Sequence, residues 1–429
     1  MTILKPKLGW MFFIFQCGAT AGLLTGHIMR IAVAWWCLDE TKSAVFFAIV
    51  ISLSAGFEIY LSPLLSSFGD HYPRLKLICS SQWGISLICL MISMMNLLSY
   101  FNIYILTCML IIISIFVCFR DPVITGTIPD LVKKEEVSDA IARRSQINSI
   151  YVFLGPLIAA FMTSYLGITA TLLSALIFSG LSSVFYQVNT CLNNSALVNA
   201  SGSGKDKLKW FEKTKSGFTA IMNVKSELYM SAFAAIINFN MYPFFSVTMP
   251  YWINQDLKLP ASYLGMFEGA FGLGLIAGSS YFLKISNLYF GRFYTILTGF
   301  LLLGVSIIFV VTINHRYIIL CFVFICGVSF MLININLNTL RVSATPPAFR
   351  VRMSAIASFI SRVFNPVGIL ISGLAVARFG VQPVVIFSGM LIIMIVPFLI
   401  LSRNVRNALS LSHKDMDGYY ERTYPSAFK

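Results

Sequence analysis

The chain has 429 residues, of which 57% are hydrophobic and only 11% are charged, and its formal net charge is +14. A soluble domain is typically about 45–50% apolar and about 25% charged, so this composition excludes a water-soluble globular protein. Apolar stretches of about 20 residues, each long enough to cross a bilayer as a helix, recur along almost the whole chain. The sequence therefore predicts an all-α integral membrane protein.

Twelve membrane-spanning helices are predicted in chain order. Six lie in the first half, at residues 10–38, 43–66, 75–98, 103–128, 145–164 and 168–186. Six more lie in the second half, at residues 226–247, 262–285, 293–313, 317–337, 353–377 and 381–401. The first span is too long for a signal-peptide core and no small-residue cleavage site follows it, so we expect it to remain in the mature protein.

The distribution of basic residues indicates the orientation in the membrane. With the N-terminus inside, most of the 31 Lys and Arg residues fall on the side of the two termini. The opposite side receives only Lys42, Lys258, Arg316 and Arg378. Basic residues concentrate in cytoplasmic loops, so the positive charge predicts a bacterial-type cytoplasmic (inner) membrane protein with both termini cytoplasmic. Nucleic acid is not expected as a partner.

A polar linker divides the predicted helices six and six. It reads NTCLNNSALVNASGSGKDKLKWFEKTKSG, and its Asn, Ser, Gly and Lys content is typical of a solvated segment. We expect an N-terminal six-helix bundle at 1–188, a cytoplasmic linker with an amphipathic stretch at 189–225, a C-terminal six-helix bundle at 226–402 and a cytoplasmic tail at 403–429. The sequence gives no reason to assign a binding role to the amphipathic stretch or to the tail.

An internal repeat relates the fifth and eleventh spans. FLGPLIAAFMTSYLG, from Phe153, aligns with PVGILISGLAVARFG, from Pro366. Gly155 then meets Gly368, and Gly167 meets Gly380. Many transporters consist of duplicated halves, so the alignment predicts two pseudo-symmetric six-helix bundles. Chance similarity between two apolar helices is the alternative.

The loop between the second and third spans, SSFGDHYPRLKL, resembles the signature G-x-x-x-D-R-x-G-R-R of the major facilitator superfamily. Asp70, Arg74 and Lys76 hold matching positions, whereas other positions of the signature are replaced. The resemblance implies a gating role for these residues, in which Asp70 pairs with bases and helix ends and steadies the outward-facing state. A short loop with inside-positive anchors is the alternative.

A second segment resembles the branch of that superfamily that contains macrolide-efflux proteins and enterobactin-type exporters. It reads RDPVITGTIPDLVKKEEVSDAIARRSQINSIYVFLGPLIAAFM, from Arg120. Gly155 and Pro156 match the core of a Gly-Pro motif associated with the antiporters of the superfamily. The resemblance implies the major facilitator fold and transport by alternating access. Small residues such as Gly155 also allow close helix approach, and the proline permits a bend.

Ionisable residues inside the spans are functional candidates, because burying a charge in the membrane costs at least about 2.5–3.5 kcal/mol. Glu58 and Arg120 lie at a similar depth, roughly 22–26 Å from the outer ends of their helices, which would allow them to pair. Burial raises the pKa of a carboxylate and a nearby guanidinium lowers it, so moving the base away makes the carboxylate take a proton. A permanent structural ion pair is the alternative.

Other polar residues in the spans extend the candidate set. Asp121 and Glu268 are further proton-coupling candidates, although Glu268 also fits an exposed acid at the outer rim. His27 and Arg30 share a helix face, so they either contact an anionic substrate or pair with Glu58 or Asp121. The remaining substrate-cavity candidates are Arg120, Asn238, Asn240 and Arg362. The two asparagines fit helix-bridging contacts equally well.

These features predict a secondary transporter rather than an enzyme. The histidines and cysteines show no metal-ligand spacing, and no catalytic motif is present, so we expect no metal or other cofactor. The expected function is proton-coupled efflux of a small amphipathic compound such as a drug, a siderophore or a peptide antibiotic, with the direction implied by the resemblance alone. A lysolipid or metabolite transporter of the same fold and a non-transporting membrane sensor or scaffold are the alternatives. The expected partners are the substrate, the proton and the bilayer, with a monomer implied by analogy.

Overall fold

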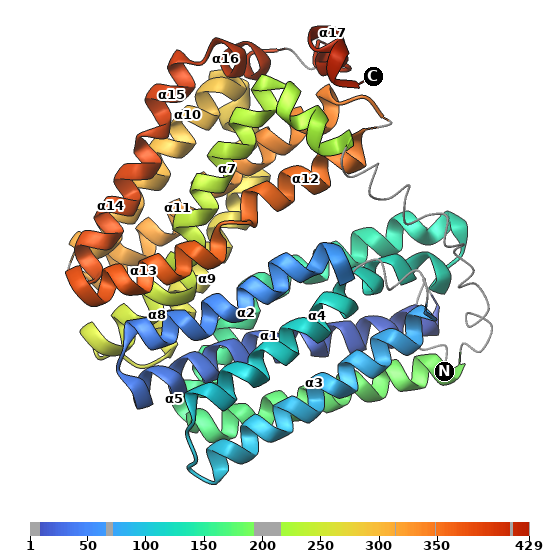
Figure 1. Cartoon of the computed structure of the whole chain (residues 1–429), viewed down its shortest axis with the longest axis vertical. Coiled ribbons are helices and arrows are strands. Elements are labelled where there is room, and N and C mark those ends of the chain that lie inside the picture. The colour runs from blue at the N-terminus through green and yellow to red at the C-terminus, as the bar shows by residue number, and fades with distance from the viewer. Residues whose placement is uncertain are drawn as a thin grey trace. The chain divides into compact units, whose positions relative to one another are not determined.

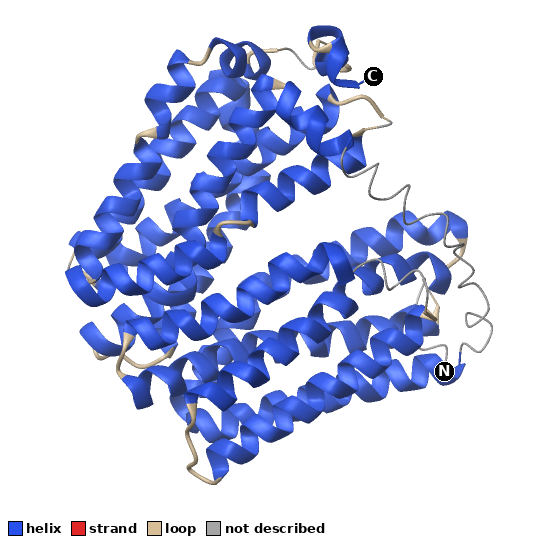
Figure 2. Ribbon diagram, viewed as in Figure 1, coloured by secondary structure: helices blue, strands red, loops and turns tan. Residues whose placement is uncertain are grey.

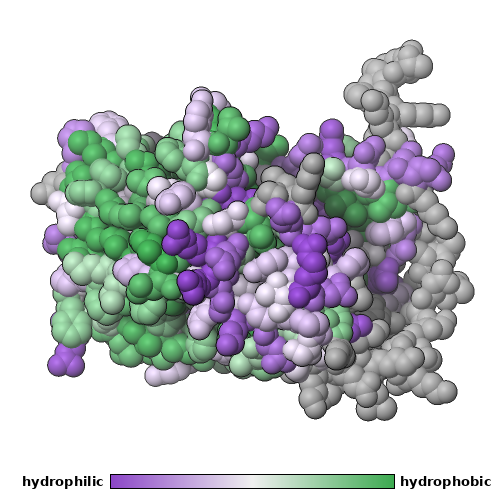
Figure 3. Space-filling model, turned by 90° about the horizontal axis from the view of Figure 1, so that it is seen from above, coloured by the Kyte–Doolittle hydropathy of each residue, from purple (hydrophilic) through white to green (hydrophobic). Residues whose placement is uncertain are grey.

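The computed structural model describes residues 9–65, 72–192, 216–313, 315–347, 349–411 and 415–428. Within these residues the regular secondary structure is helical throughout, as Figure 2 shows, which confirms the all-α class. Ten described helical stretches are long and apolar enough to cross a membrane. Figure 3 shows broad hydrophobic areas on the surface, as a protein surrounded by lipid requires.

The chain forms two compact units (Figure 1). The first unit comprises Met1–Gly202 and Met249–Gly269, and the second comprises Ser203–Thr248 and Ala270–Lys429. The main helices of the first unit are α1 (Trp10–Thr41), α2 (Ala44–Leu65), α3 (Arg74–Leu97), α4 (Ile103–Leu131) and α5 (Val137–Leu192). The unit also contains α8 (Met249–Tyr251), the π-helical turn Trp252–Asp256 and the first half of α9 (Ser262–Ala277).

The second unit contains the remaining long helices and the C-terminal segment. Its helices are α7 (Lys225–Pro243), α10 (Leu283–Thr312), α11 (Arg316–Ala344), α12 (Arg350–Arg362), α13 (Asn365–Phe379), α14 (Val381–Ile393), α15 (Ile395–Leu401), α16 (Arg403–Leu409) and α17 (Tyr419–Thr423). Two π-helical turns, Phe244–Thr248 and Gly278–Phe282, follow α7 and α9.

Two of the ten stretches are too long for a single crossing. Val137–Leu192 has 56 residues and Ser262–Thr312 has 51. Each contains one glycine with a positive φ, Gly167 at 79° and Gly291 at 72°, a conformation that residues with a side chain rarely adopt. Dividing each stretch at its glycine makes the number of crossings among the described residues consistent with the twelve spans predicted.

The glycines aligned in the internal repeat have matching roles. Gly380, between α13 and α14, has φ 79° and ψ 171°, and Gly167 has φ 79° and ψ 169°. A Cβ atom on Gly155 would lie 2.5 Å from the imidazole of His27, and one on Gly368 would lie 2.8 Å from the carbonyl oxygen of Phe239. In both units, therefore, a glycine of the repeated helix lets another helix approach closely. This agreement supports the alignment over chance similarity.

Several predicted helix boundaries require correction. The eleventh span, predicted as one helix at 353–377, consists of α12 and α13, which are separated just before Pro366. Proline lacks the N–H that a continuous helix needs, which explains the break. Helix α11 continues to Ala344 rather than ending at residue 337. The end of the tail forms α17 and a 3₁₀ turn, Pro425–Phe428.

Candidate functional site

Arg30 and Glu268 form a two-bond ion pair in the first unit. Arg30 Nη1 donates to Glu268 Oε1 at 2.9 Å, and Arg30 Nη2 donates to Oε2 at 2.5 Å. The Glu268 side chain is only 8% exposed, whereas that of Arg30 is 38% exposed. Parallel charge-assisted bonds of this kind are strong. A buried carboxylate is therefore neutralised by a cation that is itself only partly enclosed.

The sequence left open whether Arg30 contacts an anionic substrate or pairs with Glu58 or Asp121. The structure shows Arg30 paired with Glu268, far along the chain on α9. Glu268 is buried, so the exposed rim acid considered for this position is wrong. Depth along separate helices could not reveal this contact, because it depends on how α1 and α9 pack.

Small residues lie near the ion pair in sequence, at close contacts of α5 with α1 and α9. Gly155 lies against the imidazole of His27, one helical turn from Arg30. Gly265, one turn before Glu268, packs against the Cβ of Ala160 and lies near the carbonyl oxygen of Pro156. The Gly-Pro segment predicted from the sequence is thus the part of α5 at which α1 and α9 both approach closely.

Arg120 joins a second polar cluster in the first unit. Its buried guanidinium donates from Nη1 to Gln82 Oε1 at 2.6 Å and from Nε to Asp121 Oδ1 at 2.9 Å. The candidate partner, Glu58, is exposed, and its backbone carbonyl accepts a bond from Cys118 Sγ at 3.2 Å. The pairing of Arg120 with Glu58 is therefore wrong. Arg120 instead bonds the adjacent carboxylate of Asp121 and the buried amide of Gln82.

Sequence reasoning missed the polar residues that support Arg120. Gln82 is fully buried on α3 and donates from Nε2 to Ser179 Oγ at 3.2 Å. Ser86 lies within hydrogen-bond distance of Ser179 and Ser183, at 2.7 and 2.9 Å. The sequence did offer one indication, a glutamine in the middle of an apolar span. A buried amide requires hydrogen-bond partners, so other polar residues had to lie nearby.

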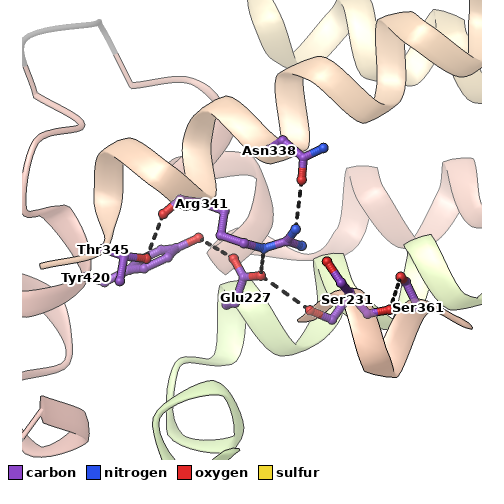
Figure 4. A network of polar contacts seen from close by, with 8 residues as sticks. Glu227, Ser231, Asn338, Arg341, Thr345, Ser361 and Tyr420 are labelled. Atoms are coloured by element: carbon purple, nitrogen blue, oxygen red, sulfur yellow. Dashed lines mark hydrogen bonds and ion pairs between the residues drawn. The ribbon is translucent and has the colours of Figure 1, made fainter. Parts of the chain in front are cut away.

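A second buried ion pair lies in the second unit (Figure 4). Arg341 Nε donates to Glu227 Oε1, and the hydroxyl of Tyr420 donates to Glu227 Oε2 at 3.0 Å. Ser231 Oγ also donates to Oε1 at 3.3 Å, and Arg341 Nη1 donates to Asn338 Oδ1 at 2.9 Å. Glu227 is 0% exposed and Arg341 is 8% exposed. This pair is therefore enclosed on both sides and satisfied by several hydrogen bonds.

The tail supplies one partner of this network and packs on the same unit. The backbone N–H of Gly418 donates to the carbonyl oxygen of Ser343 at 3.3 Å. The rings of Phe349 and Phe428 meet edge to face, with centroids 5.2 Å apart. The sequence assigned no role to the tail because it is polar and too short for a domain.

The other cavity candidates lie in the second unit. Asn238 and Asn240 each donate from Nδ2 to the carbonyl four residues earlier, at 2.8 Å, rather than to another helix. Asn240 also lines a pocket of 460 Å³ among α7, α13 and α14. Arg362 is exposed at the end of α12. The structure therefore brings Asn240 to this pocket.

Two of the gating candidates, Arg74 and Lys76, lie in the first turn of α3. Arg74 Nη1 donates to the carbonyl oxygen of Gly126 at 2.8 Å and to Asp130 Oδ2 at 3.0 Å. The residue thus ties α3 to the last turns of α4. Lys76 is exposed. Asp70 lies outside the described residues.

Comparisons with known proteins agree with this architecture. The family model described as Major Facilitator Superfamily matches residues 11–368. Macrolide efflux protein A from Streptococcus pyogenes is 20% identical over 397 residues, which cover 90% of this chain and 94% of that protein.

Several solved structures share the fold. A bacterial homologue of the iron transporter ferroportin, in an inward-facing state, has a TM-score of 0.71 at 13% identity, over 91% of this chain and 99% of that one. A bacterial homologue of the human lysosomal transporter Spinster has a TM-score of 0.67 at 12% identity, over 99% of both chains. The nucleoside transporter NupG has a TM-score of 0.67 at 12% identity, over 92% of this chain and 100% of that one. At these identities the likeness shows the fold alone.

Proposed function

This chain belongs to the major facilitator superfamily and is a multi-pass membrane transporter rather than an enzyme; we propose that it exports a small amphipathic compound in exchange for protons. The similarity to a macrolide efflux protein over nearly the full chain supports export as the direction. We place the protein in a bacterial-type cytoplasmic membrane, as a monomer with both termini cytoplasmic.

The Arg30–Glu268 pair carries the proposal for proton coupling. An unpaired carboxylate is strongly unfavourable in a buried site, so Glu268 needs a positive partner or a proton of its own. Arg30 fills this role in the structure, and its side chain is 38% exposed. A proton or a cationic group of the cargo can replace it.

Competition for one carboxylate produces exchange. Arg30, a proton and a cationic cargo group cannot all neutralise Glu268 at once, so binding of one displaces the others. Alternating access then lets a proton replace the cargo on the outside and lets the cargo replace the proton on the inside. The proposed cargo is therefore an amphipathic compound with a cationic group, which includes macrolide-like drugs.

The other predicted residues take supporting roles in this proposal. Glu58 and Asp121 remain proton-coupling candidates, and both side chains are exposed. His27, Arg120, Asn238, Asn240 and Arg362 remain proposed contacts for the cargo. Gly155 and Pro156 permit the helix motion that alternating access requires. Arg74, together with Asp70 and Lys76, is proposed to control opening at the cytoplasmic side.

The test is accumulation of a compound panel in pump-deficient cells. The panel contains macrolides, catecholate siderophores, small peptides and lysolipids, and the cells express the wild type, Glu268→Gln or Glu58→Gln. Glu40→Gln, at an exposed acid on the same unit, is the matched control. We expect the wild type and the control to lower accumulation of cationic amphiphiles, and we expect an uncoupler or Glu268→Gln to abolish this effect.

Each of the other outcomes would show that a different part of the proposal is wrong. If Glu58→Gln abolishes export and Glu268→Gln does not, the coupling carboxylate is Glu58. If anionic siderophores are exported instead of macrolides, the cationic cargo is wrong. If the wild type moves no compound of any class, the sensor or scaffold alternative replaces transport of these compounds.

A further inference from the structure

The pocket in the second unit is built by two contacts between α7 and α13. Gly368 lies against the backbone of Phe239, and Ser372 Oγ lies 2.8 Å from Thr248 Oγ1. The stretch between these contacts is longer on α7 than on α13, and it contains Pro243 and a π-helical turn. Turns of this kind recur at functional sites in helical proteins. Residues of α14, among them Val384 and Phe387, line the rest of the pocket.

The chemistry of the walls suits a hydrocarbon group. None of the residues that line the pocket is ionisable. Among its polar groups, Thr248 pairs with Ser372 and the amide nitrogen of Asn240 donates to Ile236. A charged or strongly polar ligand would lose its hydration and gain few new partners.

The rim of the pocket faces outward within the membrane-spanning part. Three lining residues, Ile371, Phe379 and Phe387, are 49%, 62% and 61% exposed. Ile371 and Phe379 belong to the spanning stretch Arg352–Phe379, and Phe387 belongs to Val381–Leu401. Exposed apolar side chains in such stretches are the ones that contact lipid chains. The pocket is therefore accessible to hydrocarbon.

We propose that this pocket binds the hydrocarbon chain of a membrane amphiphile. Its volume of 460 Å³ lies within the range of about 300–1,000 Å³ typical of small-molecule sites. Lipid chains are already in an apolar medium, so binding is driven by close contact with the pocket walls rather than by removal from water. The chain is that of a bilayer phospholipid, because the exposed rim residues lie in membrane-spanning stretches. The apolar part of the cargo, if the proposed export function is correct, is the other outcome of the test.

The test is photocrosslinking with phosphatidylcholine that carries a diazirine in one acyl chain, on the full-length protein in lipid nanodiscs. We expect crosslinked peptides from α13 and α14 at the pocket. Ala375→Phe fills the pocket from α13, and Ser388→Phe fills it from α14. Each variant is expected to lower crosslinking at these peptides by about tenfold, the loss that corresponds to about 1.4 kcal/mol of binding. Ala377→Phe, at an exposed alanine of α13 outside the pocket, should leave it unchanged.

A cationic macrolide added in excess distinguishes the two sources of the chain. Competition with the photolipid indicates that the pocket also takes the apolar part of the cargo, and absence of competition indicates a phospholipid chain alone. Equal labelling of all lipid-facing helices, or crosslinking that survives both filling variants, would overturn the proposal. The proposed export function would stand in that case if the same nanodisc protein still bound macrolide. Thermal unfolding of each variant verifies that it is folded.

Discussion

The two ion pairs with buried carboxylates among the described residues differ in how completely they are enclosed. In the second unit, Glu227 is 0% exposed and Arg341 is 8% exposed, and the carboxylate accepts further bonds from Tyr420 and Ser231. In the first unit, Glu268 is 8% exposed but its partner Arg30 is 38% exposed. A fully enclosed pair cannot release one charge without leaving the other buried. A half-enclosed pair can exchange one cation for another, which is what proton coupling requires.

Among the variants that test this comparison, Glu227→Gln is expected to lower the stability most. The variant leaves the buried guanidinium of Arg341 without its counter-charge, and such losses cost about 3–5 kcal/mol. Thermal unfolding in detergent should show a large fall in Tm relative to Glu421→Gln, a control at an exposed acid of α17. Because it removes both charges together, Glu227→Gln combined with Arg341→Met should recover part of the loss. A Tm for the single variant equal to that of the control would contradict full enclosure.

The next largest effect is expected from Tyr420→Phe. The variant removes a hydrogen bond to a buried carboxylate, and bonds to charged groups contribute about 1.5–3 kcal/mol. The same unfolding measurement applies, with Tyr419→Phe, at a less buried neighbour, as the matched control. If both tyrosine variants unfold at the wild-type temperature, the tail is not an integral part of this network.

The same residue predicts a pH dependence of stability. Burial and the neighbouring Glu227 raise the pKa of the Tyr420 phenol above its usual value of 10.0. The folded state then holds this proton when the unfolded state has lost it, so the contribution is complete below about pH 10 and falls as the pH rises beyond it. Wild-type Tm should decline more steeply above pH 10 than that of Tyr420→Phe. Parallel declines would show that the phenol is not the group responsible.

A smaller effect on stability is expected from Glu268→Gln. The Arg30 side chain it leaves behind is 38% exposed and can be solvated, so the cost should resemble that of a partly exposed pair, about 1 kcal/mol. The decisive observation is the difference between Glu227→Gln and Glu268→Gln in Tm under identical conditions. Equal losses would remove the distinction between the enclosed and the half-enclosed pair.

The smallest effect is expected from Arg74→Gln. The side chains of Arg74 and Asp130 are 42% and 44% exposed, and exposed ion pairs contribute about 0.2–1 kcal/mol. The Tm should therefore change little, whereas any gating role would appear as an altered transport rate in vesicles. A fall in Tm as large as that of Glu227→Gln would show that the contact between α3 and α4 is structural.

The sequence predicted the helices well because apolar length reports directly on membrane crossing. It also found the glycines that permit close approach, since Gly155 and Gly368 align in a repeat. Pairings between helices were harder to predict. Depth suggested that Glu58 pairs with Arg120, but the guanidinium bonds Asp121 and Gln82, because partners depend on helix rotation and packing.

The enclosed pair was missed for a related reason. The predicted end of the tenth span at residue 337 left Arg341 in a loop, where a basic residue is ordinary. The structure extends α11 to Ala344, so Arg341 lies in its last turns, against Glu227. Helix ends are the least reliable part of a sequence prediction, and here a few residues separate a solvated base from a buried one.

The most direct test of the account is transport by purified protein in proteoliposomes. Two quantities are measured for the wild type and for Glu268→Gln: macrolide movement driven by an imposed pH gradient, and exchange of labelled for unlabelled macrolide without a gradient. We predict that the variant loses gradient-driven movement and that its exchange is weakened, because its amide can neither carry a proton nor pair with the cationic group of the cargo. Gradient-driven movement at the wild-type rate in Glu268→Gln would contradict the claim that Glu268 couples the proton to the cargo.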